Sequence, residues 1–402
     1  MDLSAYIIDG VRSPIGAFGG ALREVRADDL AAHAIRSLLL RHPSLDPSSI
    51  ADVLLGCANQ AGEDNRNVAR MASLLAGLPS SVPAETINRL CASGLSAVQH
   101  VARAMANGDG DVFIAGGVEH MTRAPYVMSK SSKPFGTDSK LYDSSFGWRF
   151  VNPQMASQYG VDAMGETAEN LVDQYGISRE DQDAFALWSQ QKTAAAQSAG
   201  RLSEEIAAVR IPQRKGDALV VSYDEFPKPS SSLGGLSALR PAFRKDGSVT
   251  AGNASGLNDG AAALLMATGQ GVKSHGLTPI ARIVAGGVAG VEPRTMGIGP
   301  VPATEIALKK AGLTLADMDV IELNEAFAAQ ALACTRAMGL DDRDARINPN
   351  GGAIALGHPL GMTGARIALS ASRQLHRQNG RYALVTMCIG VGQGYALILE
   401  RA

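Results

Sequence analysis

The two ends of the chain resemble copies of each other, and this limits the possible folds more than any other sequence feature. The run Ile-Ala-Asp-Val-Leu-Leu at 50–55 resembles Asp-Met-Asp-Val-Ile-Glu at 317–322. The same offset carries Cys91 to His358 (358 − 91 = 267). Residues between these anchors match poorly, so chance similarity of two strand–helix units is the alternative. A duplication would place two strand-to-helix junctions face to face and bring Cys91 and His358 toward one cleft.

Predicted strands and helices alternate in both halves of the chain. The strands are expected at 6–11, 52–57, 85–88, 111–117, 261–266, 281–285, 320–323, 347–348, 382–387 and 395–400. The helices are expected at 28–41, 68–76, 301–311, 326–338 and 364–378, with a further one directly after Cys91. This alternation predicts an α/β protein with a mostly parallel sheet covered on both faces.

A long segment interrupts the alternation in the middle of the chain. Residues 122–160 contain Pro, Ser, Lys and Gly without clear periodicity, together with several aromatic side chains. A loop of this length in a compact chain is usually functional, for example as a lid over a site. Helices and strand-like stretches then continue to about residue 240. We therefore expect three units: an N-terminal half of 1–121 plus 249–275, an inserted loop or lid unit of 122–248, and a C-terminal half of 276–402.

Cys91 lies in the run Asn-Arg-Leu-Cys-Ala-Ser-Gly at 88–94, just ahead of an amphipathic helical pattern. The helix is expected to begin at Ala92 or Ser93, which places the thiol at its N-terminus. Free backbone N–H groups and the positive end of the helix dipole favour an anion there, and such positions lower a cysteine pKa. Cys91 is therefore a candidate nucleophile. The alternative is a small buried residue where a strand meets a helix.

Three segments of the second half contain further candidate catalytic residues. Asn324 directly follows a predicted strand and could offer its amide to an oxygen, although asparagine is also a common helix cap. His358 stands among many glycines, where backbone approaches closely, and could deprotonate a thiol near neutral pH. Cys388 ends a predicted strand and is placed to act as an acid or base. The Gly-x-Gly-x-Gly pattern after it is not a dinucleotide loop, because a strand follows it instead of a helix. Two thiols, an imidazole and an amide suit acyl transfer through a thioester.

Composition excludes several other functional classes. Hydrophobic residues make up 46% and charged residues 19%, which is typical of a globular protein. Lys and Arg number 37 against 39 Asp and Glu, so charge gives no reason to expect nucleic acid or an anionic membrane as partner. The four cysteines form no CxxC pair, and we expect neither disulfides nor a metal site. No signal peptide or membrane span is recognisable, so the expected location is the cytoplasm.

These motifs together resemble the thiolase family over essentially the whole chain. The four blocks that carry the resemblance surround Cys91, Asn324, His358 and Cys388, in the family's order and spacing. The resemblance implies two duplicated α/β halves in a layered α-β-α-β-α arrangement with an inserted loop domain, and a homotetramer built from tight dimers. It implies that Cys91 is acylated and that His358 activates it and helps to form an oxyanion hole. Cys388 would be the acid/base at the α-carbon, and Asn324 would fix a water in a second oxyanion hole.

The resemblance also implies contacts to coenzyme A, the expected cosubstrate, with no permanently bound cofactor. Ser255, in the run Ala-Gly-Asn-Ala-Ser-Gly that begins at Ala251, matches the family's pantetheine-binding serine. The positions that match the apolar tunnel are Met164, Phe243, Ala326 and Phe327. Two positions depart from many acetoacetyl-CoA thiolases: Ala163 replaces a histidine, and Lys228 stands where a loop arginine is expected near the nucleotide.

Several stretches resemble the 3-oxoadipyl-CoA thiolases of aromatic degradation, notably residues 56–70, 147–153 and 158–162. Such an enzyme cleaves 3-oxoadipyl-CoA with CoA to succinyl-CoA and acetyl-CoA. The distal carboxylate of its substrate requires a cation or several donors, for which Arg149 is the first candidate and Arg66 the second. Both arginines could instead make structural or subunit contacts. The alternative functions are an acetoacetyl-CoA thiolase, a decarboxylating ketoacyl synthase, and a non-catalytic acyl- or lipid-binding protein on the same fold.

Overall fold

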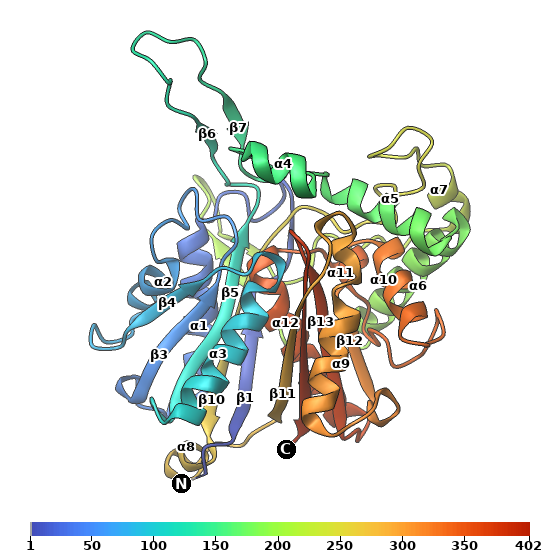
Figure 1. Ribbon diagram of the computed structural model, residues 1–402. Helices are drawn as coiled ribbons and strands as arrows, with labels where there is room; N and C mark the ends of the chain where they lie inside the picture. The colour runs from blue at the N-terminus through green and yellow to red at the C-terminus, as the bar shows by residue number, and fades with distance from the viewer. Residues whose placement is uncertain (1) are drawn as a thin grey trace.

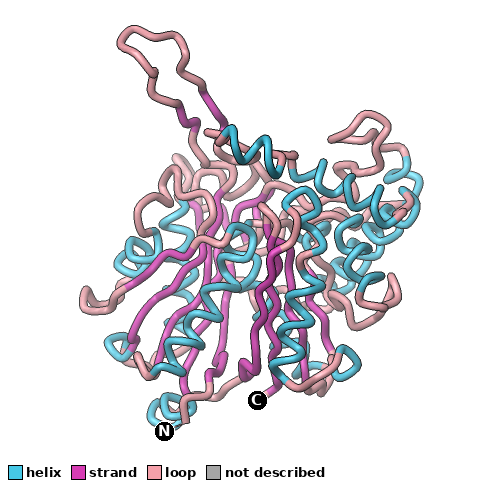
Figure 2. Tube along the Cα trace, viewed as in Figure 1, coloured by secondary structure: helices cyan, strands magenta, loops and turns pink. Residues whose placement is uncertain are grey.

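The computed structural model describes residues 2–402 and is built around one mixed sheet of ten strands (Figures 1 and 2). These strands are β1 (Ala5–Arg12), β2 (Gly16–Ala17), β3 (Ile50–Gly56), β4 (Ala84–Ile87), β5 (Val112–His120), β10 (Asn258–Thr268), β11 (Ala281–Gly290), β12 (Val320–Leu323), β13 (Tyr382–Ile389) and β14 (Gln393–Arg401). Their order in the sheet is β12-β13-β14-β11-β1-β10-β5-β3-β4, and β2 pairs with β10.

The prediction of a mostly parallel sheet is wrong. Parallel pairing is confined to the two ends, at β12–β13, β5–β3 and β3–β4. Every pairing between them, from β13 across to β5, is antiparallel. The connections explain the difference, because parallel neighbours need a crossover whereas a tight turn forces antiparallel pairing. The turn between β13 and β14 is such a case, and Val391 and Gly392 adopt positive φ angles of 63° and 82° there.

The strand order is repeated in the two halves, which confirms the internal duplication. The N-terminal half runs β1-β10-β5-β3-β4, and the C-terminal half runs β11-β14-β13-β12. An isolated parallel bridge from Ile321 to Ile347 takes the place of β4 in the second half. The halves join where Tyr6 and Ile7 of β1 pair with Arg282 and Ala281 of β11. Similarity by chance does not explain a repeated topology.

Helices form three layers around the two halves of the sheet (Figure 1). Outside the middle segment they are α1 (Ala27–Arg41), α2 (Val68–Ala76), α3 (Ser93–Asn107), α8 (Gly269–His275), α9 (Pro300–Ala311), α10 (Ala328–Ala337), α11 (Ala353–Leu356) and α12 (Leu360–Arg377). Helices α3 and α12 pack on each other and on strands of both halves, so they form the middle layer. Helices α1 and α2 cover the N-terminal half, and α9 covers the C-terminal half. The result is the expected α-β-α-β-α arrangement.

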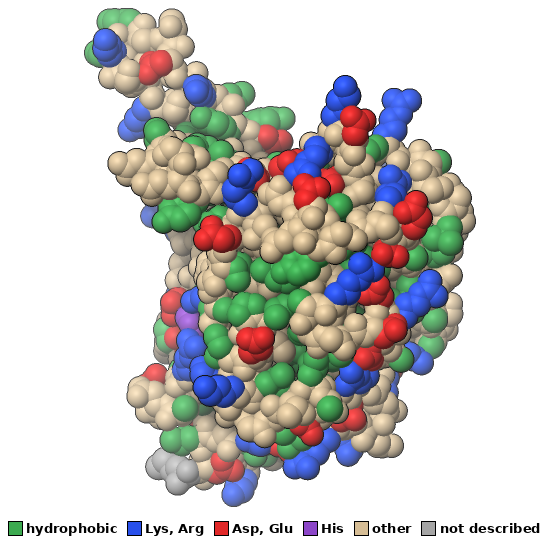
Figure 3. Space-filling model, turned by 45° about the vertical axis from the view of Figure 1, so that its right-hand side comes forward, with side chains coloured by type: hydrophobic (Ala, Val, Ile, Leu, Met, Phe, Trp, Pro, Cys, Tyr) green, Lys and Arg blue, Asp and Glu red, His purple; other side chains and the backbone are tan. Residues whose placement is uncertain are grey.

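The middle segment contains the helices and strand-like stretches expected after residue 160, and it adds short elements in the parts expected to be irregular. It comprises β6 (Tyr126–Met128), β7 (Leu141–Asp143), α4 (Pro153–Tyr159), α5 (Met164–Tyr175), α6 (Arg179–Ser198), β8 (Val209–Ile211), β9 (Leu219–Val221) and α7 (Leu233–Ser237). Strands β6 and β7 form a hairpin that projects from the body and carries basic side chains (Figures 1 and 3). Helices α5 and α6 instead pack on α10 of the C-terminal half.

A buried ion pair ties the middle segment to the first strand. The Arg12 guanidinium contacts the Asp224 carboxylate at 2.6 Å and Glu205 at 3.1 Å, and all three side chains are buried. These contacts fix the return of the chain toward β10, which leads into the site described below. Among the helices of the described chain, none combines the length and apolarity needed to cross a membrane.

Candidate active site

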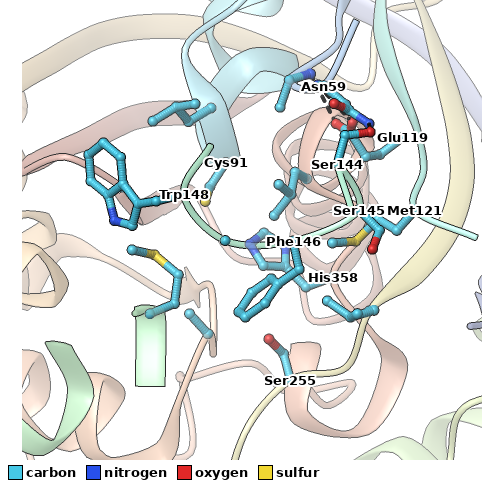
Figure 4. Close-up of a pocket in the computed structure, with 18 of the residues that line it drawn as sticks. Asn59, Cys91, Glu119, Met121, Ser144, Ser145, Phe146, Trp148, Ser255 and His358 are labelled. Carbon is cyan, nitrogen blue, oxygen red and sulfur yellow. Dashed lines mark hydrogen bonds between the residues drawn. The ribbon is translucent and has the colours of Figure 1, made fainter. Parts of the chain in front are cut away.

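A cavity of about 700 Å³ opens where the two halves meet under the middle segment (Figure 4). Both halves contribute to its wall through Cys91 and His358, and residues 144–150 of the middle segment cover it. Its other lining residues are mainly apolar and include Leu90, Met121, Phe146, Trp148, Phe150, Met164, Leu257, Met296 and Val391. The volume falls within the range of small-molecule sites.

Cys91 occupies the predicted junction between a strand and a helix. It lies in a single 3-10 turn, Leu90–Ala92, and α3 begins at Ser93 as expected. The Ser93 hydroxyl donates to the Leu90 carbonyl oxygen at 2.6 Å, and the Asn88 side chain accepts from the Leu90 N–H at 2.9 Å. The Leu90 φ of 47° turns the chain sharply just before the cysteine. These bonds hold the half-buried thiol in the cavity wall.

The pKa of Cys91 contradicts the expectation from its helix position. Burial raises this pKa to about 11, and it outweighs the backbone N–H groups of Gly390 and Cys91, which stabilise the thiolate. At this position the loss of hydration raises the pKa by more than the two N–H groups lower it. The resting side chain is therefore a thiol at neutral pH, and a base must remove its proton before it can attack. The two N–H groups are placed to stabilise negative charge beside the sulfur.

His358 lies just before α12 and is buried in the cavity wall. Its Nδ1 lies 2.8 Å from the Thr363 hydroxyl, which donates to the Pro359 carbonyl. The hydrogen-bond network therefore assigns the ring proton to Nδ1 and leaves a lone pair on Nε2. Burial, with a contribution from the charge of Arg366, lowers the imidazole pKa to about 3. A neutral ring with a lone pair on Nε2 is the form that can accept a proton.

Asn324 and Cys388 lie behind the cavity wall. Asn324 follows β12, is buried, and places its Nδ2 at 3.3 Å from the Nε2 of His358. Its Oδ1 has no hydrogen-bond partner among residues 2–402. Cys388 is buried near the end of β13, and burial together with the nearby Cys91 raises its pKa well above the usual value. The four candidates predicted from sequence thus converge on one place.

The remaining predicted site residues divide into two groups. Those that line the cavity are Ser255, Met164, Phe243, Ala326, Phe327 and Arg149. The backbone of Ser255 is held by a 2.9 Å bond to the Ala326 carbonyl oxygen. Lys228, Ala251 and Arg66 are exposed and lie outside the cavity. Arg66 therefore makes no contact with the cavity within this chain.

A buried cluster of Cys57, Asp64 and Glu119 lies beside the cavity, with ligand-type atoms within 4.8 Å of one another. The Glu119 oxygens accept backbone N–H bonds from Ala58, Asn59 and Gly361, at 2.9 to 3.0 Å. Asp64 accepts further backbone bonds from Gln60 and Gly62. Burial raises the Glu119 pKa to about 7. These carboxylates are engaged in holding the loop after β3 and the start of α12.

Several residues of the site were not identified from the sequence. The backbone N–H of Gly390 interacts with the Cys91 sulfur. The glycine-rich turn after Cys388 was the sequence feature that could have indicated this contact, because glycine permits close backbone approach. Asn59, Ser144, Phe146 and Trp148 line the cavity from loops far apart in the chain. No local pattern marks such residues, because tertiary packing alone brings their loops together. The one sequence feature that pointed to some of these residues was the long loop rich in aromatic side chains at 122–160.

Comparison with known proteins gives consistent results. Residues 5–270 match the family model for the N-terminal domain of thiolase, and residues 277–401 match that for the C-terminal domain. A 3-oxoadipyl-CoA/3-oxo-5,6-dehydrosuberyl-CoA thiolase of Escherichia coli K12 is 63% identical over 397 residues, covering 99% of each chain. A beta-ketoadipyl-CoA thiolase of Acinetobacter baylyi is 58% identical with the same coverage.

A crystal structure of human mitochondrial 3-ketoacyl-CoA thiolase in complex with CoA superimposes with a TM-score of 0.91. It is 41% identical, and the match covers 100% of this chain and 99% of that one. Matches to both family models, high identity over the full length and the same fold lead to one conclusion. The chain belongs to the thiolase family of acyltransferases.

Proposed function

We propose that the chain uses CoA to cleave 3-oxoadipyl-CoA into succinyl-CoA and acetyl-CoA through an acyl-cysteine. The observation that carries the chemistry is that Cys91 and a neutral His358 line one cavity, while the Asn324 amide contacts His358 from behind the wall. The names of the relatives from Escherichia coli and Acinetobacter baylyi support the choice of substrate. The Nδ1 tautomer leaves a lone pair on Nε2, which the Asn324 amide contacts at 3.3 Å, and this lone pair supports the assignment of His358 as the base.

The first half-reaction breaks a carbon–carbon bond. His358 takes the Cys91 proton, and the thiolate attacks the C3 carbonyl carbon of the substrate. The C2–C3 bond then breaks, its electron pair passes to C2 as the enolate of acetyl-CoA, and the Cys388 thiol donates a proton to that carbon. Acetyl-CoA leaves, and succinyl remains on Cys91. In the second half-reaction the Cys388 thiolate takes the proton of the CoA thiol, and the CoA sulfur attacks the succinyl thioester. Succinyl-CoA leaves, and the released Cys91 sulfur takes back its proton from His358, which restores all three groups.

Developing negative charge on oxygen needs donors, and the site offers two sets. The Asn324 amide and His358 form one, in which Asn324 fixes a water. The backbone N–H groups of Cys91 and Gly390 form the other, supported by their interaction with the Cys91 sulfur. Preorganised donors of this kind are expected to contribute about 3 to 4 kcal/mol each to the lowering of the barrier.

CoA is proposed to enter along the side of the cavity that contains Ser255. Met164, Phe243, Ala326 and Phe327 provide its apolar wall. The Phe243 and Phe327 rings pack edge to face at 6.1 Å between centroids. Lys228 and Ala251 are exposed and are assigned to the nucleotide end, outside the cavity. The CoA complex of the human mitochondrial relative supports CoA binding on this fold.

The organisation of the protein in the cell belongs to the same proposal. We assign residues 1–121 plus 249–275 and residues 276–402 to the two halves, with 122–248 as an inserted unit. The assembly is proposed to be a homotetramer built as a dimer of dimers, acting in the cytoplasm. Sedimentation equilibrium tests the assembly, and a monomeric mass at micromolar concentration would contradict it.

Side-by-side cleavage of 3-oxoadipyl-CoA and acetoacetyl-CoA tests the function. We expect kcat/KM to be at least about tenfold higher for the dicarboxylic substrate, the scale on which a polar contact separates substrates. Cys91→Ala should lower both activities by about 10⁴-fold or more, because it removes the nucleophile. If the enzyme prefers acetoacetyl-CoA, the proposed mechanism stands and the proposed substrate is wrong. Undiminished cleavage by Cys91→Ala would reject the mechanism.

A further inference from the structure

We infer that Arg149, held by Asn59 and Ser144, forms a subsite for the distal carboxylate of a dicarboxylic 3-oxoacyl-CoA. The inference rests on the proposed function, because it concerns the acyl tail of the same substrate. Arg149 lines the cavity, whereas the other candidate, Arg66, is exposed outside it. The subsite is defined as the Arg149 side chain with its two supports, the Asn59 side chain and the Ser144 carbonyl oxygen.

The segment that carries Arg149 is fixed to the body of the protein at several points. The Ser144 N–H and hydroxyl both donate to the Pro125 carbonyl oxygen, at 3.2 and 2.6 Å. The Trp148 indole N–H donates to the Asp162 carbonyl oxygen at 3.2 Å. On its other side the Phe150 ring packs against Tyr142, with centroids 5.0 Å apart. Arg149 is therefore presented from an ordered backbone, which lowers the entropic cost of binding a ligand.

The Arg149 guanidinium contacts only neutral acceptors. Its Nη2 donates to the Asn59 Oδ1 at 2.8 Å, and its Nη1 makes a longer contact of 3.5 Å to the Ser144 carbonyl oxygen. None of the ion pairs found over residues 2–402 includes Arg149. A guanidinium has five N–H donors in a planar fork that fits a carboxylate. A cation with donors to spare in the wall of an apolar cavity favours an anionic ligand.

Asn59 sets the direction in which the guanidinium points. Its backbone N–H donates to Glu119 at 3.0 Å, and its Nδ2 lies 3.4 Å from the Ser144 hydroxyl oxygen. With both groups engaged, Oδ1 is directed to Arg149. Glu119 is the carboxylate in this wall, and three backbone N–H groups occupy its oxygens. Asn59 is thus a positioning residue, since it acts on the ligand through Arg149.

The subsite lies on the acyl side of the reacting centre. Figure 4 places Ser255 on one side of His358, and Asn59 and Ser144 on the opposite side. A substrate whose pantetheine passes Ser255 and whose C3 carbon meets Cys91 therefore extends its tail toward the subsite. The carboxylate of a 3-oxoadipyl group stands three carbons beyond C3, whereas an acetoacetyl group ends one carbon beyond it. Only the longer, charged tail reaches toward Arg149.

Two substrates of equal length test the inference. 3-Oxoadipyl-CoA and 3-oxohexanoyl-CoA differ only in a carboxylate in place of a methyl group. Arg149→Met should lower kcat/KM for 3-oxoadipyl-CoA by about 30-fold or more, mainly through KM, the scale of losing one partner of a desolvated charge pair. Turnover of 3-oxohexanoyl-CoA should stay within about twofold, since that substrate never used the charge. Arg210→Met, at an exposed arginine of β8, is the matched control and should change neither substrate.

Asn59→Asp is a second variant that keeps the size of the side chain. It places a carboxylate next to the Arg149 guanidinium, where Asn59 Oδ1 now lies at 2.8 Å, and it competes with the substrate for the cation. We expect a selective loss of about tenfold or more for 3-oxoadipyl-CoA, with unchanged turnover of 3-oxohexanoyl-CoA. Binding of succinyl-CoA and butyryl-CoA to Cys91→Ala by calorimetry gives a readout without turnover. Arg149→Met in that background should weaken only succinyl-CoA.

The outcomes separate the inference from the proposed function. If the wild type prefers 3-oxoadipyl-CoA but Arg149→Met does not reduce it selectively, the inference is overturned and the function stands. An equal loss for both substrates gives Arg149 a structural role and also overturns the inference. If Arg66→Met selectively lowers kcat/KM for 3-oxoadipyl-CoA and Arg149→Met does not, the carboxylate binds at Arg66 and the inference is overturned. A wild type that cleaves only acetoacetyl-CoA rejects the proposed substrate itself.

Discussion

The junctions that carry Cys91 and His358 lie at matching places in the duplicated halves and have opposite chemistry. Cys91 precedes α3 and His358 precedes α12, and both helices begin at the same cavity. The thiol is half-buried with its pKa raised to about 11, whereas the imidazole is buried with its pKa lowered to about 3. Desolvation keeps both groups neutral, and that leaves the proton on sulfur and the lone pair on nitrogen.

The contrast between the two junctions separates the contribution of the duplicated backbone from that of the side chains it carries. The duplication supplies two helix N-termini directed at one place, where they favour developing negative charge. The two side chains then supply a proton donor and a proton acceptor. Neither junction suffices alone, because a thiol of this pKa is protonated at neutral pH and an imidazole without it lacks the nucleophile. The experiments below separate the two contributions.

Removal of the base is expected to have the largest effect. His358→Asn keeps a polar side chain of similar reach but cannot accept the Cys91 proton. We expect kcat for thiolysis to fall by about 10² to 10⁴-fold, the usual contribution of general base catalysis. Acylation of Cys91 should slow by a similar factor. Mass spectrometry of the intact protein measures this step. An unchanged rate of acylation would mean that another group deprotonates Cys91.

Thr363→Val provides the graded control for that experiment. It keeps the volume of the side chain and removes the acceptor that lies 2.8 Å from the His358 Nδ1. Orientation of the ring would be loosened while its lone pair remains, so we expect a smaller loss of kcat, about tenfold. A loss as large as that of His358→Asn would indicate that the tautomer matters as much as the base.

The pH dependence of alkylation tests the thiol half of the comparison. Only the thiolate reacts with iodoacetamide, and its fraction rises with pH until the pKa is passed. With a pKa of about 11, the rate at Cys91 should rise about tenfold per pH unit from pH 7 to 10 without levelling. Peptide mapping distinguishes Cys91 from the buried Cys57, Cys334 and Cys388, and Cys91→Ala is the blank. A plateau below pH 8 would show that the helix terminus outweighs burial.

Local sequence predicted most of the helices and strands, but it did not predict which strands pair or in which direction. The start of α3 at Ser93 was predicted because Cys91 and Gly94 lie beside a clear apolar periodicity. The antiparallel centre of the sheet was missed, since strand direction depends on partners that are far apart in sequence. β1, for example, pairs with β10 at Ala5–Thr268. Alternation reports which elements exist, and it does not report which strands become neighbours.

For the active site as well, sequence motifs identified the residues but did not predict their surroundings. Glycine-rich motifs and strand ends marked Cys91, Asn324, His358 and Cys388 as candidates, and the resemblance to the thiolases implied that the four act together. It predicted the wrong direction for the Cys91 pKa, since burial depends on the cavity that the whole fold forms. It also left Arg149 and Arg66 undistinguished. Only the structure separates them, because one lines the cavity and the other is exposed.

The smallest expected effects concern the contact that joins the two junctions. Gly94 and Gly361 are related by the same offset as Cys91 and His358, and a Cβ at Gly94 would lie 2.5 Å from the Gly361 carbonyl oxygen. A Cβ at Gly361 would lie 2.3 Å from the Val118 carbonyl oxygen. Because each obstacle is backbone, alanine at either position should lower the free energy of unfolding by about 1 to 3 kcal/mol.

Urea unfolding measures these losses as shifts in midpoint at constant slope. Gly234→Ala in α7 is the matched control, because a Cβ there meets nothing within 4 Å, and it should be neutral or stabilising by up to about 1 kcal/mol. The double variant Gly94→Ala/Gly361→Ala should destabilise by less than the sum of the single changes, since α12 takes part in both close approaches and one shift of this helix eases them together. Full additivity would mean that the two helix starts do not act on each other. The duplication would then bring Cys91 and His358 together through the sheet instead of through this contact.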